Sequence, residues 1–150
     1  MYQRILVPFD GSATSTRGLD EAVKLAALTG AELRIVHLVD DLQYATGFET
    51  YAAWANDVIP LMREAGTKIL HAGKARALDA GVKADALLLE GSAVRLAEAV
   101  ADQVAAWHAD LVVIGTHGRR GVGRMLLGSD AEQITRTSAV PVLLVRAIPA

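Results

Sequence analysis

Five glycines lie between positions 115 and 128, and this glycine-rich segment is the part of the sequence best suited to binding a ligand. Without a Cβ, a glycine lets backbone N–H groups come close to an anion. The segment also contains Arg119, Arg120 and Arg124, and a charge-assisted hydrogen bond contributes about 1.5–3 kcal/mol. A helix predicted to begin at Ser129 adds free N–H groups and the positive end of its dipole. These features predict a phosphate site, although composition alone equally allows a flexible connector with solvated arginines.

Other residue patterns limit which nucleotide-binding motifs, catalytic residues and metal sites the sequence can contain. The sequence has neither the G-x-x-x-x-G-K-[ST] motif nor a G-x-G-x-x-G opening its first predicted helix. His117 can act as a general base, touch phosphate or serve as a hydrogen-bonding spacer. Asp10 precedes Gly11 and is either a ligand contact or a turn former. The three other histidines lack metal-ligand spacing and the chain has no cysteine, so metal binding by protein ligands alone is not expected.

Asp130 conflicts with a phosphate site, because it places a carboxylate beside the expected position of the phosphates. At about 8 Å and an effective dielectric of about 20, each like-charge pair costs about 2 kcal/mol. That cost corresponds to about thirtyfold weaker binding. The alternative is that Asp130 stabilises the helix N-terminus while its side chain faces solvent.

Alternating strand and helix patterns must position these residues. Strands are predicted at 3–9, 32–39, 82–90, 110–116 and 140–146. Helices are predicted at 14–29, from about 56 to Gly81, from Gly91-Ser92 to about 107, and at 129–138. The second helix is expected to bury Leu61, Met62, Ala65, Ile69 and Ala72. The Ser129 and Glu132 pair fits a capping box for the last helix.

The remaining segment, 40–55, has no clean period and is predicted to be a long connection. Its aromatic residues are predicted to pack onto their own domain or to cover a ligand or partner. Helical crossovers between strands imply a parallel sheet, which binds ligands beyond the carboxyl ends of its strands.

Composition excludes several classes of protein. The 150 residues carry a net charge of −2, which gives no general attraction to nucleic acid or to anionic membranes. A membrane span needs about 18 consecutive apolar residues, and no stretch of the sequence approaches that length. A cysteine-free chain without these features fits a cytoplasmic protein.

Three ordered motifs carry a family resemblance. They are RILVPFDGS near the start, DLVVIGTHG leading into the spacing Gly115-x2-Gly118-x9-Gly128-Ser129, and PVLLVR near the end. Together they resemble the ATP-binding branch of the universal stress protein family over essentially the whole chain. The resemblance implies one domain over 1–150. Its expected fold is a three-layer α/β sandwich with a five-stranded parallel sheet of order 3-2-1-4-5, Rossmann-like and similar to the adenine nucleotide alpha hydrolases.

The same resemblance implies an adenine nucleotide site. Asp10 would contact ribose or a magnesium-bound phosphate, and the backbone of Val39 would meet adenine. The remaining implied contacts are Pro8, Phe9, Gly115, Thr116, His117, Gly118 and Arg119, with Gly128, Ser129 and Asp130 at the phosphates. The expected ligand is ATP carrying Mg²⁺, with ADP, AMP or a cyclic nucleotide as alternatives. A homodimer through Val140–Arg146 is also implied.

The resulting hypothesis is an ATP-binding stress-response or signalling module with little or no catalysis. One alternative is a slow ATPase or a self-phosphorylating protein with Ser129 or Thr116 as acceptor. Another is a structural dimer or adaptor, like the branch of the family that lacks the glycine motif.

Overall fold

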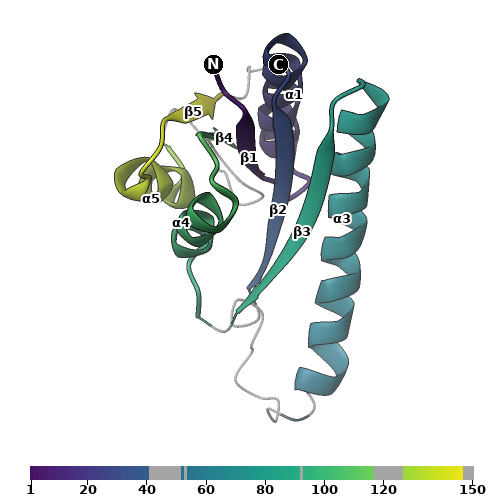
Figure 1. Ribbon diagram of the computed structural model, residues 1–150. Coiled ribbons are helices and arrows are strands. Elements are labelled where there is room, and N and C mark those ends of the chain that lie inside the picture. Colours follow the sequence, from purple (N-terminus) through teal and green to yellow (C-terminus); the bar gives the residue numbers. More distant parts are fainter. Residues whose placement is uncertain (41–51, 53, 92, 117–126, 147–150) are drawn as a thin grey trace.

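The computed structural model describes residues 1–40, 52, 54–91, 93–116 and 127–146. In this part of the chain five parallel strands form one sheet, in the order β3-β2-β1-β4-β5 (Figure 1). The strands are β1 (Arg4–Pro8), β2 (Glu32–Asp40), β3 (Ala84–Gly91), β4 (Leu111–Gly115) and β5 (Val142–Val145). The predicted parallel sheet and its strand order are therefore confirmed.

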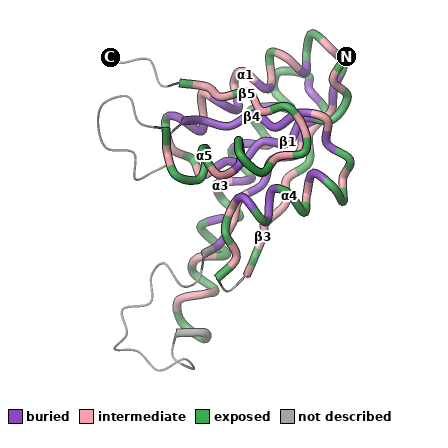
Figure 2. Tube along the Cα trace, turned by 90° about the vertical axis from the view of Figure 1, so that its left-hand side faces the viewer, coloured by how far each residue is buried: buried purple, intermediate pink, exposed green. Residues whose placement is uncertain are grey.

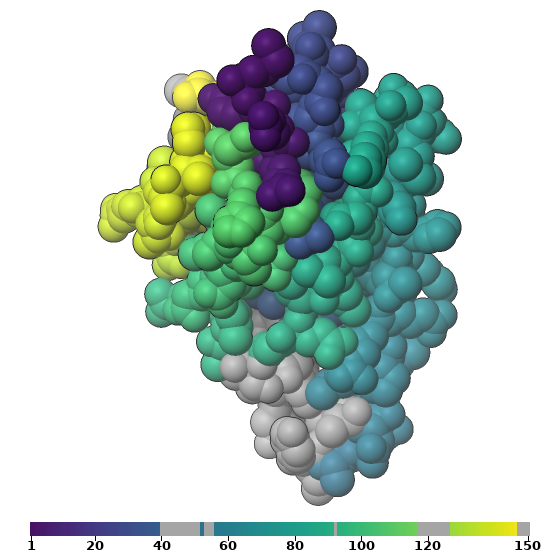
Figure 3. Space-filling view, in the orientation of Figure 1, coloured from purple at the N-terminus to yellow at the C-terminus, as the bar shows by residue number. Residues whose placement is uncertain are grey.

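Helices cover both faces of this sheet. They are α1 (Ala13–Thr29), α3 (Ile59–Asp79), α4 (Leu96–Trp107) and α5 (Ser129–Thr137), with a short π-helical segment, η2 (Trp54–Val58), before α3. Apolar side chains of α1 and α3 pack on one face, and those of α4 and α5 pack on the other. Figure 3 shows the face that carries α4, with α5 and β5 on one side of it and β3 on the other. The result is the expected three-layer arrangement.

Strands β1 and β4 form the centre of the core. All residues of β4, and all of β1 after Arg4, are buried (Figure 2). Ile5 and Val7 point into the layer of α1 and α3, whereas Leu6 points into the layer of α4 and α5. A parallel strand that is buried on both faces reads as a continuous aliphatic run, which explains why ILVP and LVVIG show little alternation.

The packing face of α3 differs from the sequence prediction. Leu61 is 66% exposed, and Ala65 and Ala72 are also exposed. The buried positions are Gly66, Leu70, Gly73 and Ala77. A Cβ at Gly66 would lie 2.8 Å from a methyl carbon of Leu88, and one at Gly73 would lie 2.9 Å from the ring of Phe9. The helix therefore approaches the sheet through its glycines. The prediction considered only apolar side chains at helical spacing, so it did not include these glycines.

The start of α4 also differs from the prediction. The helix begins at Leu96, and Gly91 belongs to β3 instead. At the other end of α4, the guanidinium of Arg34 lies 4.7 Å from the centroid of the Trp107 ring, a cation–π contact.

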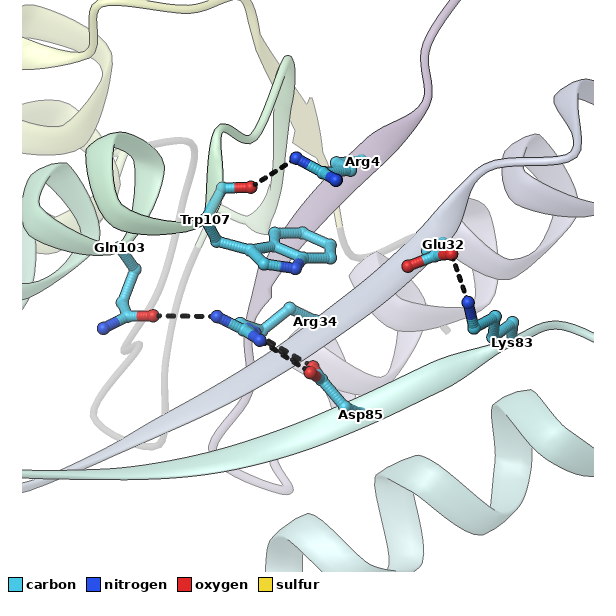
Figure 4. A network of polar contacts seen from close by, with 7 residues as sticks. All are labelled: Arg4, Glu32, Arg34, Lys83, Asp85, Gln103 and Trp107. Atoms are coloured by element: carbon cyan, nitrogen blue, oxygen red, sulfur yellow. Dashed lines mark hydrogen bonds and ion pairs between the residues drawn. The ribbon is translucent and has the colours of Figure 1, made fainter.

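A polar network around Arg34 joins α4 to β2 and β3 (Figure 4). Nη2 of Arg34 donates to Oδ2 of Asp85 at 2.7 Å, and Nη1 donates to Oε1 of Gln103 at 3.5 Å. The hydrogen bond with Asp85 raises the pKa of Arg34 above its ordinary value. The Arg34–Asp85 ion pair joins β2 to β3, and the contacts of Arg34 with Gln103 and Trp107 join α4 to the sheet.

Candidate functional site

The candidate site lies at the carboxyl ends of β1 and β4, where the strand order reverses. In that order β1 stands between β2 and β4. Its register with β4 includes Ile5 opposite Leu111 and Leu6 opposite Val112. In open α/β sheets the reversal point leaves a crevice beyond the strand ends. The structure therefore brings the residues after Pro8 and after Gly115 to the same edge of the sheet.

Strand β2 forms one side of this edge. Its register with β1 ends at Pro8 opposite Val36, but β2 continues to Asp40 and pairs with β3 as far as Gly91. The side chain of Val39 is buried, at 3% exposure. Residues 37–40 thus extend beyond the end of β1, and Val39 lies three residues past the last β1 partner.

The end of β1 is tied to β2 by two hydrogen bonds. The backbone N–H of Phe9 donates to the carbonyl oxygen of Val36 at 2.8 Å. Nδ1 of His37 lies 2.9 Å from the carbonyl oxygen of Phe9. The Phe9 side chain is buried against α3. The backbone that leads into Asp10 is therefore held in place from the β2 side.

Asp10 sits in the turn that leads into α1. Its Oδ1 accepts hydrogen bonds from the backbone N–H of Ser12 at 2.9 Å and from Oγ of Ser15 at 2.7 Å. Gly11 has a φ of +77°, a conformation that glycine adopts at no steric cost. An Asp whose side chain accepts a hydrogen bond from the N–H two residues further along the chain forms an Asx-turn. Asp10 is thus both a turn former and a carboxylate at the edge of the candidate site.

Thr116 anchors the end of β4. Its backbone N–H donates to the carbonyl oxygen of Val145 at 3.0 Å, and its own carbonyl oxygen accepts from the N–H of Gly128 at 2.7 Å. The second bond joins two residues that are twelve positions apart in the sequence. It places the N-terminus of α5 beside the carboxyl end of β4.

Gly115 lets α1 approach β4 closely. A Cβ at this position would lie 2.7 Å from the backbone carbonyl oxygen of Thr14. A Cβ on Gly18 of α1 would lie 3.1 Å from the backbone nitrogen of Gly115. Contacts this short leave no room for a side chain, so the two glycines set the distance between the start of α1 and the end of β4.

The N-cap of α5 is Gly128, with φ −59° and ψ 150°. The predicted capping box is therefore wrong, because Ser129 is the first helical residue and Glu132 lies one position too far along the helix to complete the motif. Glycine has no side chain with which to cap the first N–H groups. This is the kind of helix end that an anion can approach.

Asp130 is exposed in the first turn of α5, together with Glu132. A carboxylate there interacts favourably with the positive end of the helix dipole. That placement agrees with the role at the helix N-terminus that the sequence left open.

Several predicted contacts fall outside the described residues. They are His117, Gly118 and Arg119, as well as Arg120 and Arg124. The aromatic positions Tyr44, Phe48 and Tyr51 of the predicted connection also fall outside the described residues.

The predicted site residues that the structure does describe lie at one edge of the sheet. They are Pro8, Phe9, Asp10, Val39, Gly115, Thr116, Gly128, Ser129 and Asp130.

Sequence reasoning missed Ser15 and His37 as neighbours of the candidate site. Ser15 contacts Asp10, and His37 contacts the preceding peptide. The signal for Ser15 was available, since the N-cap residue Ser12 places the side chain three residues later near the same turn. The contact of His37 depends on the pairing of β1 with β2.

Two features are absent among the described residues. None of their helices is long and apolar enough to cross a membrane. None of their His, Asp and Glu side chains gather in groups of three that would hold a metal ion.

Comparisons with known proteins point to the same family over nearly the whole chain. The model of the universal stress protein family matches residues 1–146. A universal stress protein of Methanocaldococcus jannaschii is 32% identical over 146 residues, which cover 97% of this chain and 83% of that protein.

Solved structures give the same picture. A protein from the universal stress protein family from Burkholderia pseudomallei is 32% identical, with a TM-score of 0.77 and 97% of each chain covered. The crystal structure of a universal stress protein in complex with cAMP is 27% identical, with a TM-score of 0.69 and 97% of each chain covered.

Proposed function

Because the chain belongs to the universal stress protein family, we propose that it binds an adenine nucleotide, ATP, and acts as a nucleotide-dependent stress-response or signalling module. The observation that carries this proposal is the hydrogen bond from the N–H of Gly128 to the carbonyl oxygen of Thr116. It sets the glycine-capped N-terminus of α5 beside the end of β4. A glycine-rich segment with three arginines connects these two anchors. Phosphates bound there would meet backbone N–H groups and a helix dipole.

The proposed nucleotide lies across the ends of β1 and β4. Adenine lies against the part of β2 around Val39 that extends beyond β1. Asp10 contacts ribose or the magnesium that ATP carries, since a carboxylate oxygen is a ligand that Mg²⁺ accepts. The segment from Gly115 to Arg119 lines the nucleotide, and Gly128, Ser129 and Asp130 border the phosphates.

The cAMP complex of a relative supports the class of ligand, because it is the complex of a universal stress protein with an adenine nucleotide. ADP, AMP and a cyclic nucleotide present the same base and at least one phosphate. The proposal names ATP because the three arginines of the segment suit a polyphosphate. We also propose that residues 1–150 form one domain and that the protein is cytoplasmic, where it meets ATP.

Nucleotide that remains bound through purification tests this proposal. The chain is purified without added nucleotide and denatured by heat, and the released small molecules are identified by mass spectrometry. We expect an adenine nucleotide in an amount that scales with protein concentration. If no adenine nucleotide is released and added ATP does not bind, the results would favour the alternative, a structural dimer or adaptor that binds no nucleotide.

We predict that the purified chain releases phosphate from ATP no faster than a buffer blank. The described site offers backbone donors and hydroxyls, and among the described residues no group of three or more His, Asp and Glu side chains is placed to hold a metal ion. The rival is a slow ATPase or a protein that phosphorylates its own Ser129 or Thr116. Thr116 is 6% exposed, which works against it as an acceptor. A steady-state rate above the blank that disappears with Gly128→Val would establish the rival.

We further propose that the chain forms a homodimer through Val140–Arg146. Strand β5 lies at one edge of the sheet, and its Leu143 is 41% exposed. An exposed apolar edge strand is a surface for pairing with another chain. Sedimentation of the wild type is expected to give a dimer, and that of Leu143→Lys a monomer. Leu28→Lys, at an 83% exposed position of α1, is the control and should remain dimeric; a monomeric wild type would contradict the proposal.

A further inference from the structure

The hydroxyl of Ser15 forms a short hydrogen bond with the Asp10 carboxylate. Its Oγ lies 2.7 Å from Oδ1 of Asp10 and 3.3 Å from the Asp10 backbone nitrogen. Ser15 is 6% exposed, and its own N–H donates to Oγ of Ser12 at 3.1 Å. The position of Ser15 is therefore set by the first turn of α1, beneath the carboxylate.

The direction of the hydrogen bond follows from the two acceptors within reach. The single hydroxyl proton of Ser15 can go to Oδ1 of Asp10 at 2.7 Å or to the carbonyl oxygen of Ser12 at 3.2 Å. A bond to a carboxylate is charge-assisted and is stronger than one to a neutral carbonyl. Ser15 thus donates to Asp10, and in return it accepts from the backbone N–H of Asp10.

We infer that Ser15 is a positioning residue for nucleotide binding, and that it acts through Asp10 without touching the ligand. The inference rests on the proposed nucleotide site. Asp10 has two side-chain torsions, and a bound carboxylate is useful only in the orientation that meets the ligand. The Ser12 N–H and the Ser15 hydroxyl both reach Oδ1, and together they restrict those torsions before the ligand arrives.

Calorimetric titration with Mg·ATP tests the inference on the full chain. We expect Ser15→Ala to weaken ATP binding about fivefold, the size of one lost hydrogen bond. Ser15→Thr retains the hydroxyl and should restore most of the affinity. Thr16→Ala is the matched control, because it removes the next hydroxyl of the same helix turn, which donates to the Ser12 carbonyl and not to Asp10. Its affinity should equal that of the wild type.

A double-mutant cycle with Asp10→Ala, which removes the Oδ1 acceptor, separates positioning from a general structural role. In the Asp10→Ala background we expect Ser15→Ala to cause no further loss of affinity. An equal loss in both backgrounds would overturn the inference, as would a Ser15→Ala affinity within twofold of the wild type. If the wild type itself binds no ATP, the proposed function fails and this inference fails with it. Binding that is insensitive to Ser15 contradicts the inference alone.

Discussion

Gly128→Val is expected to weaken ATP binding by about 100-fold while the chain keeps its fold. Gly128 has φ −59° and ψ 150°, which a valine adopts without strain. Its branched side chain would stand at the N-terminus of α5, where phosphate oxygens are proposed to meet backbone N–H groups. Loss of two charge-assisted hydrogen bonds, at about 1.5 kcal/mol or more each, accounts for a factor of this size. Titration calorimetry measures the affinity.

Gly128→Ala provides the graded comparison, because it adds a single carbon at the same place. We expect it to lose less affinity than Gly128→Val, and we expect both variants to unfold at nearly the temperature of the wild type. Alanine is a weaker N-cap than glycine, so a cost of up to about 1 kcal/mol in stability is allowed. Unchanged affinity in Gly128→Val would refute the assignment of the phosphates to this helix end. The sequence predicts the same loss of binding for Gly118→Val, at a position outside the described residues.

Gly115→Ala is expected to lower the free energy of unfolding by about 2 kcal/mol, the typical cost of overpacking a tight contact. The added Cβ would lie 2.7 Å from the carbonyl oxygen of Thr14. Because that oxygen is backbone, the contact can be relieved only by moving α1 away from β4. For a chain of this size the loss corresponds to a melting temperature about 4–8 °C lower.

The control for this variant is again Gly128→Ala, the same substitution at the other end of the glycine-rich segment. Chemical denaturation should show a clearly larger loss for Gly115→Ala than for Gly128→Ala. Equal stability of Gly115→Ala and the wild type would mean that α1 and β4 are not in close contact. Since the same shift would separate Asp10 from Thr116, the destabilised variant should also bind ATP more weakly.

Strand positions were the part of the fold most open to prediction. Runs such as LVVIG are buried on both faces, so their composition alone marks them as central parallel strands. The face of α3 was not predictable in the same way. Gly66 and Gly73 face the sheet because the rings of His37 and Phe9 and the side chain of Leu88 fill the space beside them. Such a fit depends on residues far away in the sequence.

The same distinction applies to the candidate site: local sequence patterns could place some of its residues, whereas others depend on contacts that are distant in the sequence. Asp10, Gly115 and Thr116 stand at the ends of strands, and strand ends in a parallel sheet meet at one edge, so their placement followed from local patterns. The start of α5 at Ser129 was also predicted correctly, but its capping box was not, because Gly128 takes the N-cap position and its carbonyl oxygen accepts from the N–H of Glu132. The contact between His37 and the Phe9 carbonyl likewise exists only once β2 lies beside β1.

Titration of the nucleotide-free chain with Mg·ATP tests the central claim most directly. The chain is first unfolded and refolded, or dialysed extensively, so that any bound nucleotide is removed. We expect saturable heat with one ATP for each chain, and competition by ADP and AMP for the same site. Absence of binding heat at millimolar ATP, from a chain with native thermal unfolding, would contradict it.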